Sequence, residues 1–292
     1  MDHRARKWGA VACGVLVAVI VLIGLAFSFV YLNSESILRR RYDVALQPIA
    51  VPTDAASIAE GRRLATIRGC NDGCHGKGVS GGEFLDEPFV ARLVAPDLTR
   101  IAATHSDSEL ERVIRHGVRK NGRTTWVMPS SMFHHLTDAD LGRIIAFLRS
   151  LLPGSGPDTE TSFGPLARFE ILRHPEYAQA LEIEQDAPWL TAADATGAHA
   201  AGHYLAITVC SECHGMDLRG SSDGSTPNLT VVGSYSPEAF ARLMRTGIAV
   251  GERKLGLMSD VAEERFAHLN DDEVRALYAY LSARASNPSP EN

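Results

Sequence analysis

The chain has 292 residues, of which 45% are hydrophobic and 22% are charged. This is the composition of an ordinary globular protein, so a wholly disordered or fibrous chain is excluded. The formal net charge of −6 gives no basic surface for a nucleic-acid partner, and the five cysteines are too few and too clustered for a disulfide scaffold.

The first predicted element is a membrane-spanning helix. Residues 9–32 carry no charge, and about 20 apolar residues are enough to span a bilayer. Basic residues lie on both sides of this run, at 4–7 and 39–41, so charge indicates the orientation only weakly. The alternative is a cleaved signal peptide, but the run is long for one and no small-residue cleavage site follows. We therefore expect residues 1–53 to form an uncleaved single-pass anchor and its lead-in.

The rest of the chain contains one set of motifs twice, in residues 54–152 and 193–285. Each copy has Gly-x-x-Leu-Ala, a cluster that ends in Cys-His-Gly, then Pro-[Asp/Asn]-Leu-Thr, and a stretch that ends in Arg-x-Gly. A methionine follows the last glycine at the same spacing in both copies, at Met128 and Met258. The repeat therefore predicts two domains of one kind.

Capping patterns predict the helices of both domains. Helix starts of the capping-box or Ser-Pro type occur at Ser106, Thr137, Ser236 and Asn270, and glycine stops occur at Gly117 and Gly247. The apolar residues after the starts recur at the spacing of one helix face, and we recognise no alternating strand pattern. The predicted fold class is therefore all-α. An acidic linker at 153–192, with a short helix at 163–172, connects the domains, and a tail follows at 286–292.

The second cluster, Cys210-x-x-Cys213-His214, is the attachment signature of c-type haem. The two thiols can bond to the two vinyl groups of the porphyrin, and the adjacent imidazole can then bind iron. A zinc site would need four ligands, and this repeat has only these two cysteines. A thioredoxin-like redox pair would need an α/β pattern, which is not recognisable here.

The first cluster has three residues between Cys70 and Cys74 instead of two, while His75 still follows directly. We expect Gly73 to absorb the extra residue by adopting a positive φ. The alternative is a decayed site with a free thiol or a local disulfide. Because the rest of the repeat is preserved, we predict two covalently attached c-type haems.

Each iron also needs a sixth ligand, and His/Met ligation is usual for electron transfer. The matched spacing selects Met128 and Met258. The competitors are Met132, His105, His116, His134 and His135 in the first repeat, with bis-histidine ligation left open, and Met216 and Met244 in the second. A ligating histidine normally donates its other ring N–H to an oxygen, and the carbonyls of Pro96 and Pro227 are the expected acceptors.

These motifs resemble those of class I c-type cytochromes, and more narrowly of membrane-anchored dihaem cytochromes, including cytochrome subunits of bacterial periplasmic alcohol and sugar-acid dehydrogenases. The resemblance implies two tandem class I cytochrome c domains that face the periplasm from a single-pass anchor in the bacterial inner membrane. It also implies electron transfer between a redox protein partner (a dehydrogenase, an oxidase or a soluble cytochrome) and the respiratory chain. The chain has two domains where those dehydrogenase subunits commonly have three, and its layout also resembles the dihaem subunit of some haem–copper oxidases.

The expected function is therefore that of an electron carrier and not of an enzyme. A dihaem peroxidase would need an iron with an open or displaceable sixth position and a distal acid or base, for which His134 or His135 would serve. The matched methionines in both repeats weigh against it. A haem-based sensor would need a signalling domain, and we recognise none in the sequence.

Overall fold

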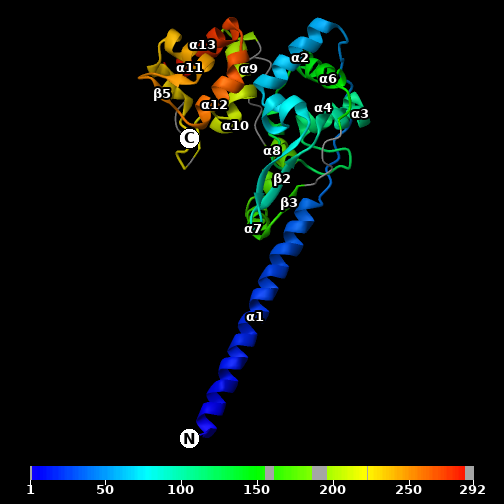
Figure 1. Ribbon diagram of the computed structural model, residues 1–292, viewed down its shortest axis with the longest axis vertical. Helices are drawn as coiled ribbons and strands as arrows, with labels where there is room; N and C mark the ends of the chain where they lie inside the picture. Colours follow the sequence, from blue (N-terminus) through cyan, green and yellow to red (C-terminus); the bar gives the residue numbers. More distant parts are fainter. Residues whose placement is uncertain (1, 155–160, 186–195, 222, 287–292) are drawn as a thin grey trace.

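The computed structural model describes residues 2–154, 161–185, 196–221 and 223–286. It shows one long helix that carries a head of two lobes (Figure 1). The fold is 62% helical with 8% strand, so the prediction of a mainly helical protein is confirmed. The predicted tail lies outside the described residues from residue 287 onward.

The long helix is α1 (Asp2–Leu38). Its segment Lys7–Leu38 is long and apolar enough to cross a membrane, and its most apolar window has no residue buried in the protein. Trp8 and Tyr31, near its two ends, are exposed, as is typical of aromatic side chains at the two membrane–water boundaries. The helix therefore has the features of a membrane anchor.

The first lobe contains the helices α2 (Ala55–Ile67), α3 (Leu98–Thr104), α4 (Asp107–His116), α5 (Ser130–Phe133) and α6 (Asp138–Arg149), and the short turns η1 (Cys70–Cys74) and η2 (Lys77–Val79). Ser106 and Glu109 form the expected capping box at the start of α4, and Gly117 ends this helix in the left-handed conformation. The Thr137 side chain caps α6. The predicted caps are thus confirmed, and the apolar faces of these helices enclose one core.

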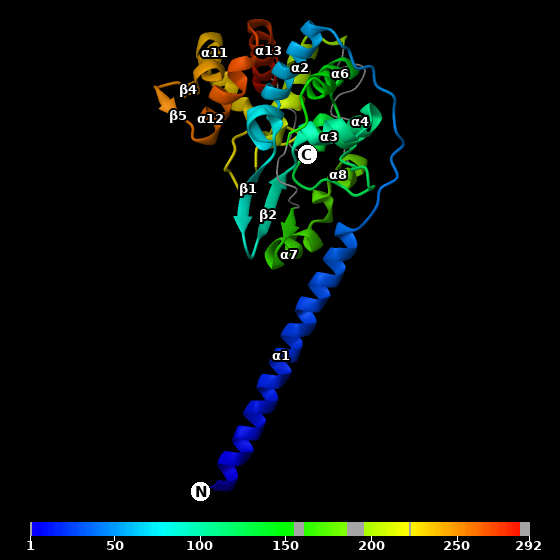
Figure 2. The same ribbon diagram turned by 45° about the vertical axis from the view of Figure 1, so that its right-hand side comes forward.

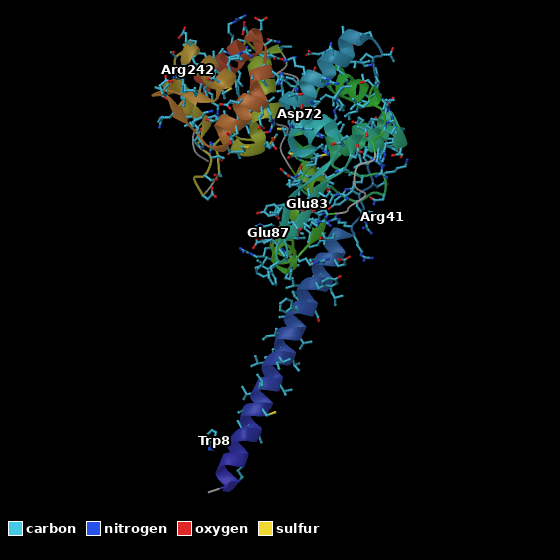
Figure 3. The ribbon with its side chains drawn as sticks, viewed as in Figure 1. Trp8, Arg41, Asp72, Glu83, Glu87 and Arg242 are labelled. Carbon is cyan, nitrogen blue, oxygen red and sulfur yellow. The ribbon has the colours of Figure 1, made fainter. Side chains whose placement is uncertain are left out.

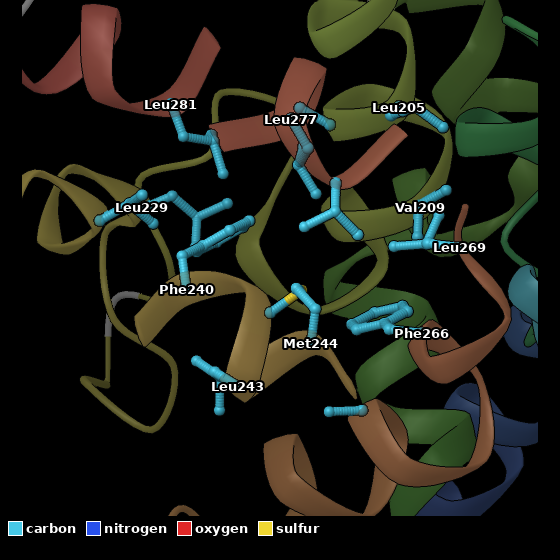
Figure 4. Close-up of a cluster of buried hydrophobic side chains, with 14 of the residues drawn as sticks. Leu205, Val209, Leu229, Phe240, Leu243, Met244, Phe266, Leu269, Leu277 and Leu281 are labelled. Atoms are coloured by element: carbon cyan, nitrogen blue, oxygen red, sulfur yellow. The ribbon is translucent and has the colours of Figure 1, made fainter. Parts of the chain in front are cut away.

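The second lobe contains α9 (Ala200–Leu205), η5 (Ala206–Cys210), α10 (Ser211–His214), η6 (Leu229–Ser234), α11 (Pro237–Thr246), β4 (Ile248–Ala249), β5 (Arg253–Lys254), α12 (Leu257–Glu264), η7 (Phe266–His268) and α13 (Asp271–Ser286). Ser236 caps α11, and Gly247 ends it in the left-handed conformation, as expected. Figure 4 shows the core of this lobe, in which Phe240 and Met244 of α11 lie with Leu277 of α13.

The expectation that the chain has no strands is wrong. β1 (Gly82–Glu87) and β2 (Ala91–Ala95) form an antiparallel hairpin, and β3 (Ser162–Phe163) pairs with β2. Most side chains of β1 are exposed, so the strand has no buried face to produce an alternating sequence pattern. A hairpin of this kind is recognisable only from its tertiary pairing.

The segment 161–185 packs against the first lobe and α1. The expected short helix is present as α7 (Pro165–Arg173), followed by η3 (Pro175–Tyr177) and α8 (Gln179–Gln185). The Ser131 N–H donates to the Gln179 side-chain oxygen at 3.1 Å, and the Ala180 N–H donates to the Thr124 hydroxyl at 3.0 Å. This part of the predicted linker is therefore folded structure, while residues 155–160 and 186–192 lie outside the described residues.

Gly61 and Gly202, the glycines of the repeated Gly-x-x-Leu-Ala, let two helices cross closely in each lobe. A Cβ at Gly61 would lie 1.8 Å from the carbonyl oxygen of Arg143 on α6. A Cβ at Gly202 would lie 2.1 Å from the carbonyl oxygen of Ala276 on α13. Both lobes therefore join their first and last helices through the same backbone contact.

The two lobes, which lie side by side in Figures 1 and 2, share both polar and apolar contacts. Arg63 of α2 bonds both carboxylate oxygens of Glu273 of α13, at 2.7 and 2.8 Å. The buried Arg68 lies 3.3 Å from the Tyr204 hydroxyl. Ile67 packs in the core of the second lobe and Tyr204 against the core of the first. The lobes are thus held in one arrangement by shared packing.

Candidate haem sites

The second motif lies on a nearly continuous helical segment that runs from α9 through η5 into α10. The His214 ring is buried, and its Nδ1 lies 2.8 Å from the carbonyl oxygen of Pro227. Because a carbonyl oxygen can only accept, Nδ1 carries the proton and Nε2 keeps a lone pair for a metal. Burial lowers the pKa of His214, which favours the neutral ring that binds iron.

The first motif holds its histidine in the same way. His75 is buried, and its Nδ1 lies 2.9 Å from the carbonyl oxygen of Pro96. Burial lowers the pKa of His75 as well, and the hydrogen bond to Pro96 opposes this shift. The structure thus places each of the two singled-out prolines against the histidine of its own repeat.

The three-residue spacer of the first motif is accommodated differently from the expectation. Gly73 has a φ of −115°, and the left-handed residue is Asp72, with a φ of 58°. Three residues do not fit the helical turn that two fill in the second motif, so the backbone leaves helical geometry between the cysteines. The buried Asn71 stabilises this loop by donating to the Thr66 hydroxyl at 3.1 Å, and the Gly78 N–H donates to the Asp72 carboxylate at 3.3 Å.

Two glycines that sequence reasoning missed help to position the histidines. The N–H of Gly81 donates to the carbonyl of His75, and the N–H of Gly220 donates to that of His214, each at 2.8 Å. Both have a positive φ, and a Cβ at Gly220 would lie 2.2 Å from the carbonyl oxygen of Thr226. They let the segments with the acceptor prolines approach the histidines. Their equal spacing from the histidines in the two repeats is the signal that could have found them.

The thiols and imidazoles together fit a c-type haem. Burial raises the pKa of the Cys70 thiol to about 11 and that of Cys210 to about 12, and the nearby Arg265 opposes both shifts. All five cysteines, each within the described residues, are free thiols, so the first pair has not formed a disulfide. Each lobe therefore offers two thiols for the porphyrin vinyl groups and one imidazole for iron. Among the described residues, no three His, Cys, Asp or Glu side chains gather to bind a metal ion by themselves.

The candidate sixth ligands lie at the edges of the two cores. Met128 precedes α5 and is half-buried against the first core, and Met258 lies in the first turn of α12, half-buried against the second. Met244 is fully buried in its core. Met132 is also buried, and it lines a cleft of about 440 Å³ between the lobes together with Met216. Met128 and Met258 are thus less enclosed than Met132 and Met244, and each lies in the lobe of its own motif. Met216 is half-buried as well, but it lies only two residues after His214.

Equivalent arginines hold the chain that follows each candidate methionine. Arg115 donates to the carbonyl of Leu136 at 2.6 Å, and Arg245 donates to the carbonyl of Ala267 at 3.0 Å. The same two arginines belong to the repeated Arg-x-Gly motif. His134, considered as an alternative ligand, has its Nδ1 3.1 Å from the Arg115 carbonyl oxygen, and burial lowers its pKa.

Arg265 of the second lobe contacts the second motif and the segment just before the first. Its Nε donates to the carbonyl of Ile67 at 3.1 Å, just before the first motif. Its Nη1 pairs with Glu212, inside the second motif, at 2.9 Å. Gly69 lies beside this guanidinium, 2.9 Å from its central carbon to a Cβ placed on Gly69, and its φ of 74° favours glycine. The two motifs therefore lie next to each other across the lobe interface.

Comparison with known proteins agrees with this assignment. The model of the family described as "Cytochrome C oxidase, cbb3-type, subunit III" matches the chain twice, at residues 56–148 and 197–281. These matches cover more than half of the chain, which therefore belongs to this family of c-type cytochromes. The protein is a haem-binding electron-transfer cytochrome with a membrane anchor.

Curated relatives give a more specific comparison. The chain is 23% identical over 265 residues to the fructose dehydrogenase cytochrome subunit of Gluconobacter japonicus, covering 80% of this chain and 54% of that protein. It is 24% identical over 285 residues to the alcohol dehydrogenase (quinone) cytochrome c subunit of Gluconobacter oxydans, covering 83% and 58%. It is 25% identical over 272 residues to the gluconate 2-dehydrogenase cytochrome c subunit of Pantoea cypripedii, covering 78% and 59%. The chain thus spans a little over half the length of these relatives.

Proposed function

We propose that the protein is a dihaem electron carrier that takes electrons from a dehydrogenase and passes them to the respiratory chain. One haem is held by Cys70, Cys74, His75 and Met128, and the other by Cys210, Cys213, His214 and Met258. The observation that carries the proposal is the matched pair of buried histidines, each oriented by a proline carbonyl beside two free thiols. When bound, each haem supplies one-electron exchange at its iron.

The chain's own residues contribute position and environment. The proline carbonyls orient the imidazoles, and Arg115 and Arg245 fix the segments that follow the methionines. A thioether as sixth ligand raises the reduction potential and leaves no open position for a substrate. This matched arrangement favours a carrier over a peroxidase.

Electron exchange between the two haems within one chain is part of this proposal. The contacts of Arg265 with Ile67 and Glu212 support it, because they bring the two attachment segments together at the lobe interface. A single carrier can then accept an electron at one lobe and release it from the other.

The proposed location is the bacterial inner membrane, with α1 as a single span and both lobes in the periplasm. The proposed donor is a membrane or periplasmic dehydrogenase, because the curated relatives are cytochrome subunits of dehydrogenases. A second candidate function is that of the dihaem subunit of a haem–copper oxidase, which the description of the matching family favours. Purification from detergent-solubilised membranes would distinguish the two, because the carrier would retain either a dehydrogenase or an oxidase.

The haem assignment is tested by mass spectrometry and near-infrared spectroscopy of the matured protein. We expect two covalent haems and two methionine–iron bands in the ferric state. The double variant Cys210→Ala with Cys213→Ala should keep one haem, on the first lobe. A wild-type protein with one haem, carried only by the second lobe, would show that Cys70 and Cys74 are not an attachment site. A high-spin haem would favour the peroxidase instead.

A further inference from the structure

Three exposed apolar side chains gather beside one end of α1. Phe89, at the tip of the β1–β2 hairpin, is 73% exposed, and Leu166 and Phe169 of α7 are 57% and 46% exposed. The hairpin tip and α7 are joined, because the Leu166 N–H donates to the Phe89 carbonyl at 3.0 Å. We name these three residues the hairpin–α7 patch. Exposed apolar groups that gather in this way mark an interaction surface.

The patch lies at the level where the apolar part of α1 ends. Arg168 of α7 pairs with Glu35 at 2.8 Å and donates to the Ser34 hydroxyl at 3.1 Å. Its guanidinium also lies over the Tyr31 ring, 4.3 Å from the ring centre. Because Leu32 is the last residue of the apolar run, these contacts bring α7 to the boundary of the membrane core. Both views show α7 and the hairpin tip alongside the upper end of α1 (Figures 1 and 2).

We propose that the hairpin–α7 patch inserts into the lipid interface beside α1, so that the head has a second contact with the bilayer. The exposed face of α7 also carries Arg173, whose guanidinium lies 5.8 Å from the centre of the Phe169 ring. Aromatic side chains next to an arginine are typical of the interface, where the ring enters the apolar boundary and the charge reaches the headgroups. The second contact would restrict rotation of the head about α1 and would set how the haem sites face their partners.

Lipid is the occupant that the position of the patch favours. A bilayer spanned by α1 surrounds that helix on all sides, so lipid reaches the patch without any further component. Figure 3 shows the acidic Glu87 at the hairpin beside the upper part of α1, and Asp86 adds a second negative charge there. Arg173 is itself paired with Glu170 at 3.5 Å, so with these two negative charges the patch has no net attraction to anionic headgroups. The contact must therefore come from apolar burial, and it should form on uncharged lipid.

The test is photocrosslinking of the full-length protein in phosphatidylcholine nanodiscs. Phe89→p-benzoyl-phenylalanine and Phe169→p-benzoyl-phenylalanine each replace an exposed aromatic ring of the patch by a photoreactive one. Leu257→p-benzoyl-phenylalanine is the matched control, because Leu257 is 70% exposed on the second lobe. We expect lipid adducts at positions 89 and 169 and none at 257, as read by mass spectrometry.

Each of the following outcomes overturns the proposal. One is the absence of lipid adducts at positions 89 and 169, or equal yields at 257. Another is an adduct with a protein subunit instead of lipid when the same variants are irradiated in native membranes.

A further variant separates the contribution of the patch from that of the anchor. Phe89→Glu with Leu166→Glu should sharply reduce the lipid adduct at position 169, while α1 keeps the protein in the membrane. An unchanged yield at 169 would also refute the insertion.

Discussion

Replacing Gly61 by alanine should destabilise the first lobe by forcing α2 away from α6. The new Cβ would lie 1.8 Å from the Arg143 carbonyl oxygen, whereas ordinary contact begins at 3.4 Å. The backbone on both sides is helical and cannot yield locally, so we place the overpacking cost near the top of its usual range, at about 3 kcal/mol. The higher helix propensity of alanine offsets about 1 kcal/mol of this cost, because glycine is the poorer helix former. The net loss is about 2 kcal/mol, which lowers the melting temperature by roughly 4–8 °C for a protein of this size.

The assay is thermal unfolding of the detergent-solubilised protein, followed by circular dichroism. Gly82→Ala is the control, because its Cβ would meet nothing within 4 Å. Gly202→Ala should behave like Gly61→Ala, since its Cβ would lie 2.1 Å from the Ala276 carbonyl oxygen. If Gly61→Ala has the same melting temperature as the wild type and the control, the close crossing of α2 and α6 does not exist in solution.

Three further predictions concern the haems and the contact between the lobes. Met128→Ala and Met258→Ala should each remove one methionine–iron band and lower the reduction potential of one haem, while that haem stays attached. Redox titration with near-infrared spectroscopy measures both effects. If neither variant loses a band, the choice of these two methionines as ligands is refuted. The hydrogen bonds of Arg63 hold the pKa of Glu60 below its usual 4.5. A carboxyl whose pKa is lowered by folding stabilises the fold above its unfolded pKa, and this stabilisation is lost as pH falls through the folded value. Melting temperatures measured from neutral pH to below pH 4.5 should therefore decline less for Glu60→Gln than for the wild type, and parallel curves would contradict this. Arg265→Gln should slow electron exchange between the haems, as measured by pulse radiolysis, while both haems stay attached. An unchanged rate would show that Arg265 does not contribute to electron exchange between them.

Local sequence signals predicted the elements whose stability depends on neighbouring residues. The capping box of Ser106 and Glu109 and the left-handed stops at Gly117 and Gly247 are present as expected, because a cap involves only residues one turn apart. The haem-attachment motif is equally local, since Cys213 and His214 are adjacent in the chain. The long apolar run of α1 was recognisable for the same reason.

Predictions failed where the sequence carries no regular pattern. The β1–β2 hairpin was missed because most side chains of β1 are exposed and leave no periodic pattern. The positive φ of the first motif falls on Asp72 rather than Gly73, in a loop where Asn71 contacts Thr66, only five residues away. A three-residue spacer matches no regular turn, so the motif alone does not indicate which of its residues adopts the positive φ.

The sequence alone was sufficient to identify an anchored protein with two repeated units and the signature of covalent haem, because composition, periodicity and motif spacing lie within short stretches of chain. Only the tertiary structure decided how these units are combined. It placed Arg265 against Glu212 of the second motif and against Ile67 just before the first, and it set α7 on the end of α1 through Arg168. These pairings join residues far apart in the chain, so they depend on how whole helices pack, which no single stretch of sequence encodes.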